Sequence, residues 1–173
     1  MPPHSTSEGH AERSELRSVA EALATGPVDV MLGRLIPRLR REAKIPEIAG
    51  MSDFEIEDHL GCLARVVLRM LAYRAEPGMP ERLMQDHVEV QAYLAGRHGA
   101  SRFRSGWDRG AIVREFTIMR DELMRVIRDL APLNPGVTGD AAQLLWALVE
   151  EAEGASIQGW EAEAGGTTEG PTL

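Results

Sequence analysis

Residues 53–75 read DFEIEDHLGCLARVVLRMLAYRA, and this stretch decides the fold class. Its apolar residues return at steps of four and three, which is the spacing of one face of an α-helix. The residues on that face are Ile56, Leu60, Leu63, Val67 and Met70. Ser52 and Glu55 form a capping-box pattern that predicts where the helix begins. A helix over 53–75 would be about 35 Å long, a length typical of a bundle, and we take it as the central core element.

Helical patterns occur on both sides of this segment, and no stretch shows the alternation of a strand. The other segments that predict helices are residues 13–24, 28–44, 80–94, 111–130 and 140–157. The expected fold is therefore all-α, a bundle of five or six helices forming one domain over residues 13–160. Residues 1–12 are expected to be a disordered leader, and residues 161–173 a disordered polar tail.

Several residues predict helix breaks or caps. Pro37 lies inside the segment 28–44, where a proline removes a backbone hydrogen bond and predicts a kink or a split. Gly96 and Gly99 are expected to interrupt the helix that begins at residue 80, because glycine is a poor helix former. Asp140, with Gln143 three residues later, is expected to cap the last helix.

The composition excludes some classes of partner. The chain has 173 residues and a formal net charge of −8, so its surface repels phosphate backbones and nucleic acid is not expected as a partner. No apolar run reaches the roughly 20 residues that span a bilayer. The first residues also lack the basic start and apolar core of a signal peptide, which indicates a cytoplasmic protein without a membrane partner.

A basic cluster ends the second predicted helix, and it consists of Arg38, Arg40, Arg41 and Lys44. Positive side chains at a helix C-terminus complement the helix dipole. We prefer this interpretation to a binding patch, which is the alternative that a run of basic residues suggests.

No set of catalytic side chains stands out. The histidines do not show the metal-binding spacing His-Glu-x-x-His, and the sequence has neither a Gly-x-Ser-x-Gly turn nor a phosphate-binding loop. Cys62 lies beside the core face of the helix 53–75, and we interpret it as a small buried thiol rather than a nucleophile. We therefore expect no catalytic residues, no metal and no cofactor. A small helical enzyme is the least favoured alternative.

His87 and His98 are eleven residues apart, which is close to three helical turns. On an unbroken helix both imidazoles would point the same way, and either would be a candidate axial ligand for haem. A haem or small-ligand sensor with a globin-like fold is therefore the first alternative function. The favoured interpretation of His87 is a core or boundary histidine with a backbone partner.

Arg102 and Arg104 precede a predicted helix that carries Glu115. A buried or half-buried Arg–Glu pair would act as a structural clamp that fixes the angle between the two helices. Gly106 lies between these arginines and the helix that carries Glu115, and it predicts a turn with a positive φ or a close approach of two helices.

The segment 98–106, HGASRFRSG, followed by 112–120, IVREFTIMR, resembles the RsbRD-like N-terminal domain of stressosome co-antagonist proteins and some sensor histidine kinases. The pattern is a histidine, an arginine and a glycine at steps of four, then a helix carrying Glu-aromatic-x-x-x-Arg. The matching positions are His98, Arg102, Gly106, Glu115, Phe116 and Arg120. The run 52–71 is similar to the family's capped first core helix, and the resemblance covers about residues 28–157.

The resemblance implies a helical bundle, globin-like without haem, that dimerises and passes a signal to an output partner. The expected function is a non-catalytic sensory module of bacterial stress-response or two-component signal transduction. Its partner would be a signalling kinase or an anti-sigma-antagonist-type protein. In multidomain relatives the last helix continues into that output domain, whereas this sequence ends in a glycine-rich tail, which suggests a fragment or a free-standing version.

Two apolar faces make a homodimer the expected assembly. The first is a heptad seam along 111–130, formed by Ile112, Phe116, Met119, Leu123, Val126 and Leu130, which suits a core as well as a partner helix. The second is the wide apolar band of the last helix. We expect the dimer interface to include Leu144, Leu148 and Ala152.

Overall fold

The computed structural model describes residue 18 and residues 28–42, 45–75, 78, 80–130 and 135–166. Within these residues the fold is all-α, as predicted, and no strand occurs. Its elements are α2 (Val28–Glu42), the short 3-10 helix η1 (Pro46–Gly50), α3 (Asp53–Ala75), α4 (Glu81–Arg104), α5 (Arg109–Leu130) and α6 (Pro135–Gly166). The predicted leader 1–12 and the predicted helix 13–24 lie outside the described residues, apart from the helical Ser18.

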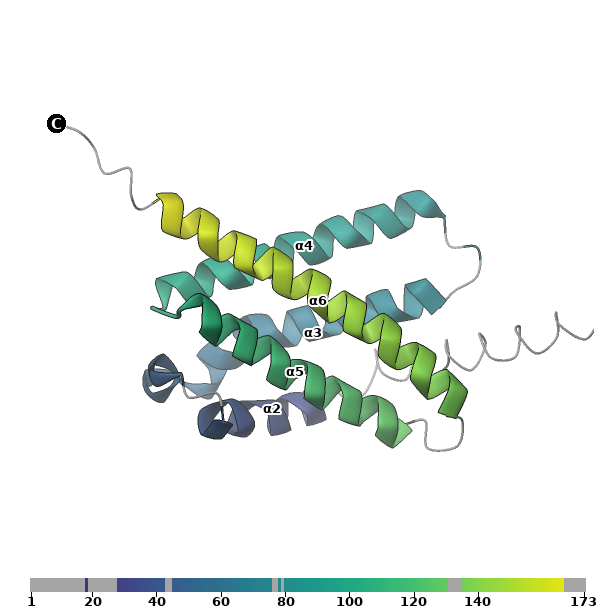
Figure 1. Cartoon of the computed structure of the whole chain (residues 1–173), viewed down its shortest axis with the longest axis horizontal. Coiled ribbons are helices and arrows are strands. Elements are labelled where there is room, and N and C mark those ends of the chain that lie inside the picture. Colours follow the sequence, from purple (N-terminus) through teal and green to yellow (C-terminus); the bar gives the residue numbers. More distant parts are fainter. Residues whose placement is uncertain are drawn as a thin grey trace, which may run out of the picture.

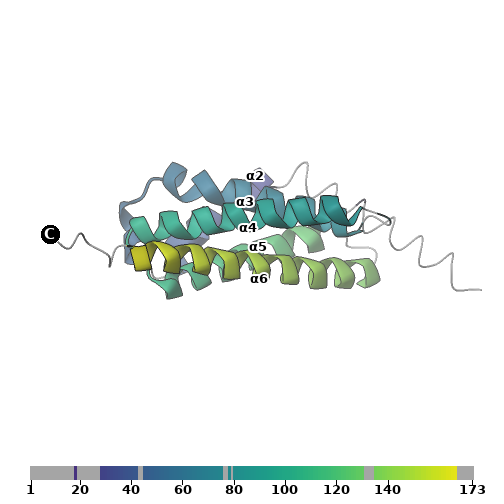
Figure 2. The ribbon, with the colours of Figure 1, turned by 90° about the horizontal axis from the view of Figure 1, so that it is seen from above.

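The helices form an elongated bundle. α3 and α4 make an antiparallel hairpin, and α6 crosses the bundle diagonally in front of it (Figure 1). In the turned view all the labelled helices lie along the length of the molecule (Figure 2). α4 and α6 form the most extensive helix pair, while α2 packs against α3 and α5. None of the helices in the described ranges has the length and the apolar character needed to cross a membrane.

α3 is a core helix with the bounds that the sequence predicts. All five residues of its apolar face are buried. The capping box forms, because the backbone N–H of Ser52 donates to the Glu55 carboxylate at 2.7 Å and the N–H of Glu55 donates to the Ser52 hydroxyl at 3.2 Å. Cys62 is exposed, so the expectation of a buried thiol is wrong. The reason is geometric, since one residue along a helix turns a side chain by about 100°.

The apolar seam of α5 faces the interior of the chain. The five seam residues that the structure describes are all buried and belong to the main core, and they are Ile112, Phe116, Met119, Leu123 and Val126. The side chain of the sixth, Leu130, lies outside the described residues. Burial within one bundle, rather than contact with a partner helix, accounts for this seam.

Neither α2 nor α4 is split where the sequence predicts an interruption. α2 continues through Pro37, because the buried Leu35, Ile36 and Leu39 on either side keep the segment packed on the core. α4 continues through Gly96 and Gly99 as a single helix to Arg104. Here tertiary packing outweighs the local preference of proline and glycine.

One glycine of α4 and one of α6 allow these two helices to cross closely. A Cβ atom added at Gly99 would lie 1.7 Å from the backbone oxygen of Ser156, and one added at Gly159 would lie 2.0 Å from the oxygen of Gly96. α4 and α6 therefore touch backbone to backbone, which only glycine allows at these positions.

α6 is longer than predicted at both ends. It begins at Pro135, a residue suited to the first helical turn, so Asp140 lies inside the helix and does not cap it. It ends at Gly166, so residues 161–166 of the predicted disordered tail are helical, while 167–173 lie outside the described residues.

Candidate functional site

A buried cluster of three charged or polar side chains joins α4 to α5. His98 and Arg102, one helical turn apart on α4, both contact Glu115 on α5. The Nε2 atom of His98 lies 2.7 Å from the Glu115 carboxylate, and the Arg102 Nη2 donates to the same carboxylate at 2.7 Å. All three side chains are buried. The predicted Arg–Glu clamp therefore exists and includes a histidine.

Arg102 extends the cluster to a third helix. Its Nη2 donates to the backbone carbonyl of Ile56 at 3.1 Å, near the start of α3. Its guanidinium also stacks over the indole ring of the buried Trp107, 4.4 Å from the ring centroid. A buried arginine is tolerated only when its donors are satisfied, and here carboxylate, carbonyl and aromatic face provide that environment. Arg102 thus ties α3, α4 and α5 together.

The electrostatics of the cluster favour an ionised Glu115. Burial by itself raises the pKa of this carboxyl, but the neighbouring His98 and Arg102 overcome that effect through their charge and hydrogen bonds and lower it to about 2. Glu115 therefore stays a carboxylate that accepts hydrogen bonds and does not act as a general acid near neutral pH. The arrangement is suited to fixing helix positions.

The turn between α4 and α5 is built on glycine. Gly106 has a φ of +83°, as its position in the sequence predicts. The N–H of Trp107 then donates to the carbonyl of Arg102 at 3.0 Å, and the side chain of Asp108 caps α5 by accepting from the N–H of Ala111. This turn carries Trp107 under the Arg102 guanidinium.

The C-terminal part of α6 contacts the same turn through hydrogen bonds and ring packing. The indole N–H of Trp160 donates to the carbonyl of Trp107 at 2.7 Å, and its ring meets that of Phe103 edge to face. Arg104 pairs with Glu163 at 3.0 Å. Sequence reasoning missed this role of α6, although a lone tryptophan before a predicted tail was a signal for it.

The structure brings together four of the six residues of the resemblance motif. His98, Arg102 and Glu115 form the cluster, and Phe116 packs its ring 5.9 Å from that of His98. Gly106 lies in the adjoining turn. Arg120 lies elsewhere, with its guanidinium 3.8 Å from the centroid of the Trp146 ring on α6.

His87 and His98 do not share a site. His87 is half-buried, its Nδ1 hydrogen-bonds the carbonyl of Leu83, and its ring meets Tyr73 of α3. The interpretation of His87 as a boundary histidine with a backbone partner is confirmed.

The residues predicted for the dimer interface pack toward the core of the bundle. Leu148 and Ala152 are fully buried inside the bundle, and Leu144 is half-buried against the core. The apolar band of α6 is covered by α3, α4 and α5 of the same chain, so Leu148 and Ala152 are not available to a second copy.

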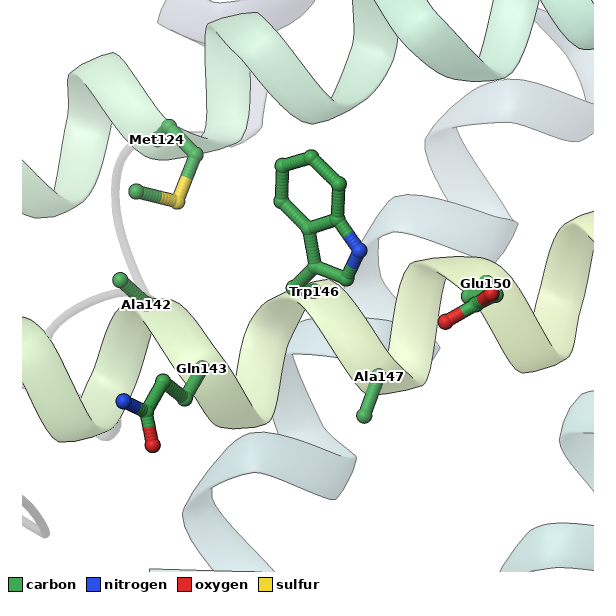
Figure 3. Close-up of a pocket in the computed structure, with 6 residues that line it drawn as sticks. All are labelled: Met124, Ala142, Gln143, Trp146, Ala147 and Glu150. Carbon is green, nitrogen blue, oxygen red and sulfur yellow. The ribbon is translucent and has the colours of Figure 1, made fainter.

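The exposed apolar surface of α6 lies beside this band. A cavity of about 320 Å³ opens between α5 and α6, and we call it the Trp146 groove. Figure 3 shows the Trp146 side chain standing between the two helices, opposite Met124 of α5. The residues that line it are Met124, Ala142, Gln143, Trp146, Ala147 and Glu150.

No clustered metal ligands accompany these sites. Among the residues that the structure describes, no three His, Cys, Asp or Glu side chains are placed to hold a metal ion together.

The resemblance to the RsbRD-like domain stays a prediction that rests on the motif residues. Neither a scan against protein-family models nor searches of curated proteins and solved structures found a match to this chain.

Proposed function

We propose that this chain is a non-catalytic regulatory module that acts through protein contacts, and that a second copy of the chain covers the Trp146 groove. The observation that carries the proposal is the exposed tryptophan. The side chain of Trp146 is held against Arg120, yet the residue remains 49% exposed beside an apolar groove. A large aromatic side chain in such a position is typical of a contact surface.

Charge complementarity favours a second copy as the occupant. Along α5 the groove is bordered by Arg120, whose guanidinium lies over the Trp146 ring. Along α6 it is bordered by Glu150 and Glu153, and the pKa of Glu153 is raised by partial burial and by Glu150, against the effect of Arg120. One border is therefore basic and the other acidic.

A two-fold axis parallel to the groove would place α5 of one copy opposite α6 of the other. Each basic border would then face an acidic one, and the two Trp146 side chains would lie near the axis. Such a self-complementary contact is the usual geometry of a homodimer. A direct pairing of α6 with its twin is disfavoured, because α6 carries no lysine or arginine and both copies would present carboxylates.

Sedimentation equilibrium at tens of micromolar tests the dimer. We expect the native protein to be a dimer and Trp146→Ala to be a folded monomer with unchanged circular dichroism. Tyr93→Ala removes an aromatic that is 65% exposed on α4, and it should remain dimeric. A monomeric native protein, or a dimeric Trp146→Ala variant, contradicts the proposed interface.

The motif resemblance supports a place in bacterial stress or two-component signalling, with a kinase or an anti-sigma-antagonist-type protein as the output partner. Proximity labelling in cells of the source organism tests this, with Trp146→Ala and Tyr93→Ala compared to the native chain. Enrichment of a signalling protein by native chain and Tyr93→Ala supports the proposal. Labelling dominated by metabolic enzymes in all three contradicts it.

Haem sensing, with His98 or His87 as the axial ligand, is the second candidate, and the contacts of His98 disfavour that residue as the ligand. His98 uses Nε2 for Glu115, so an iron ligand there would have to break a buried 2.7 Å contact. Gly99, the next residue, already touches the backbone of α6. An absorbance band in the Soret region that is lost in His98→Ala would restore this candidate.

A further inference from the structure

A second polar site lies between α2 and α5, away from the His98 cluster. It is a cleft of about 380 Å³, which we call the arginine cleft. Six charged residues line it, and they are Arg34, Arg38, Arg41, Arg125, Glu42 and Glu122. On a chain with a net charge of −8, this concentration of arginine is unusual.

One buried carboxylate organises the cleft. Glu122 is only 1% exposed, and three guanidiniums surround it. The Arg38 Nη1 donates to its carboxylate at 3.1 Å, whereas the Arg34 Nε and the Arg125 Nη1 lie 3.5 Å and 3.6 Å from it. Glu122 therefore gathers three positive charges at one place and neutralises one.

The remaining carboxylates compensate Arg38 and Arg34. Arg38 donates to Glu42 at 2.7 Å and to Asp121 at 2.8 Å, and Arg34 lies 3.5 Å from Asp129. Arg34 and Arg38 are therefore engaged with carboxylates of the protein itself.

Arg41 and Arg125 are compensated least. Arg41 lies 3.9 Å from Glu42, a carboxylate already bonded to Arg38, and its side chain is 69% exposed. Arg125 shares Glu122 with two other guanidiniums and is 54% exposed. Both side chains therefore line the cleft while more than half of each stays exposed.

We propose that the arginine cleft binds a small molecule that carries a phosphate monoester, with the phosphate held by Arg41 and Arg125. Glu42, Glu122, Asp121 and Asp129 together balance the charge of the four arginines, but Arg41 and Arg125 are the least compensated, and two guanidiniums match a group that carries roughly −1.5 to −2 charges near pH 7. The planar donors of guanidinium suit phosphate oxygens. The volume also lies in the range of about 300–1,000 Å³ of small-molecule sites, so the cleft accommodates more than the phosphate group.

This site stands apart from the proposed function, since the cleft lies between α2 and α5 and the Trp146 groove between α5 and α6. Its test is direct binding of inorganic phosphate, phenyl phosphate and succinate, measured by isothermal titration calorimetry at low ionic strength. We expect phenyl phosphate to bind more tightly than inorganic phosphate, and both more tightly than succinate.

The decisive comparison uses two double variants that remove the same charge. Arg41→Ala with Arg125→Ala should weaken phenyl phosphate binding about tenfold or more. Arg65→Ala with Arg109→Ala removes two exposed arginines outside the cleft and should leave binding unchanged. Equal weakening in both variants would show general charge screening and would overturn the proposal.

Two further outcomes also overturn it. Succinate binding as tightly as phenyl phosphate would assign the cleft to dicarboxylates, and no binding of any probe would exclude the site. If the alanine double variant loses its helical signal, Arg41→Lys with Arg125→Lys replaces it. Lysine keeps the charge but lacks the planar donors, so binding should still weaken several-fold.

Discussion

The Nε2 atom of His98 lies 2.7 Å from the carboxylate of Glu115, and neither side chain is exposed to solvent. The same carboxylate accepts hydrogen bonds from the Nε and the Nη2 of Arg102, which also reaches α3. Loss of Glu115 would leave the Arg102 guanidinium buried without its counter-charge, and both α4 side chains contact this one carboxylate, so the three side chains behave as one unit. This unit sets how α3, α4 and α5 meet, and through Trp107 it adjoins the end of α6.

Removing the carboxylate charge should be costly. Glu115→Gln leaves Arg102 buried without its counter-charge, and we expect the free energy of unfolding to fall by about 3–5 kcal/mol in urea titrations. Glu161→Gln is the matched control, because that glutamate is exposed and lies 3.7 Å from an exposed arginine. Its loss should stay below about 1 kcal/mol. Equal losses for the two variants would show that the cluster adds no stability.

The Glu115 carboxylate also predicts how the free energy of unfolding depends on pH. The pKa of Glu115 is about 2 in the folded protein against an ordinary 4.5. A lowered folded-state pKa means that this stabilisation, about 3 kcal/mol, is present above pH 4.5 and is lost as the pH falls toward 2. Urea titrations between pH 2 and 7 measure it as the difference between the native protein and Glu115→Gln. A difference that does not change over this range would contradict the prediction.

The crossing of α4 and α6 predicts opposite effects of alanine at two glycines. At Gly99 the added Cβ would meet a backbone oxygen, so Gly99→Ala should destabilise the fold by about 3 kcal/mol or more. At Gly154, also helical, the added Cβ meets nothing within 4 Å, and Gly154→Ala should stabilise by about 0.5–1 kcal/mol. Thermal unfolding of both variants measures this. A tolerated Gly99→Ala would place the helices farther apart than described.

Two neighbours on α3 test its register. Leu63 is 1% exposed, so Leu63→Ala should cost about 2–5 kcal/mol of stability. Cys62 is exposed, and Cys62→Ala should cost less than about 0.5 kcal/mol. Chemical denaturation gives both values, and similar costs would mean that the apolar face of α3 is misplaced.

Much of the fold and part of the site follow from local sequence. The bounds of α3 come from an apolar face and a capping box, both of which are short-range patterns. The Arg102–Glu115 clamp and the positive φ of Gly106 were also expected, because a charged pair flanking a glycine restricts how two helices connect. The addition of His98 to the clamp was missed, since sequence spacing offered haem ligation instead.

Other features depend on what each helix meets. The apolar band of α6 was equally suited to a partner, and only its position against three helices of the same chain shows that Leu148 and Ala152 are buried. Trp146 lies on the neighbouring face of α6, and the sequence pattern predicts no role for it, because it does not show which face the other helices cover. Periodicity describes a face but does not identify what covers it.

The sequence by itself therefore determined the all-helical class, the central helix and the charged clamp, because each rests on residues within a few turns of one another. Only the tertiary structure decided that Gly96 and Gly99 continue a helix, that α6 extends to Gly166, and that three arginines converge on Glu122. These outcomes depend on contacts between segments about 50 to 90 residues apart, and burial there outweighs the local preferences that the sequence displays.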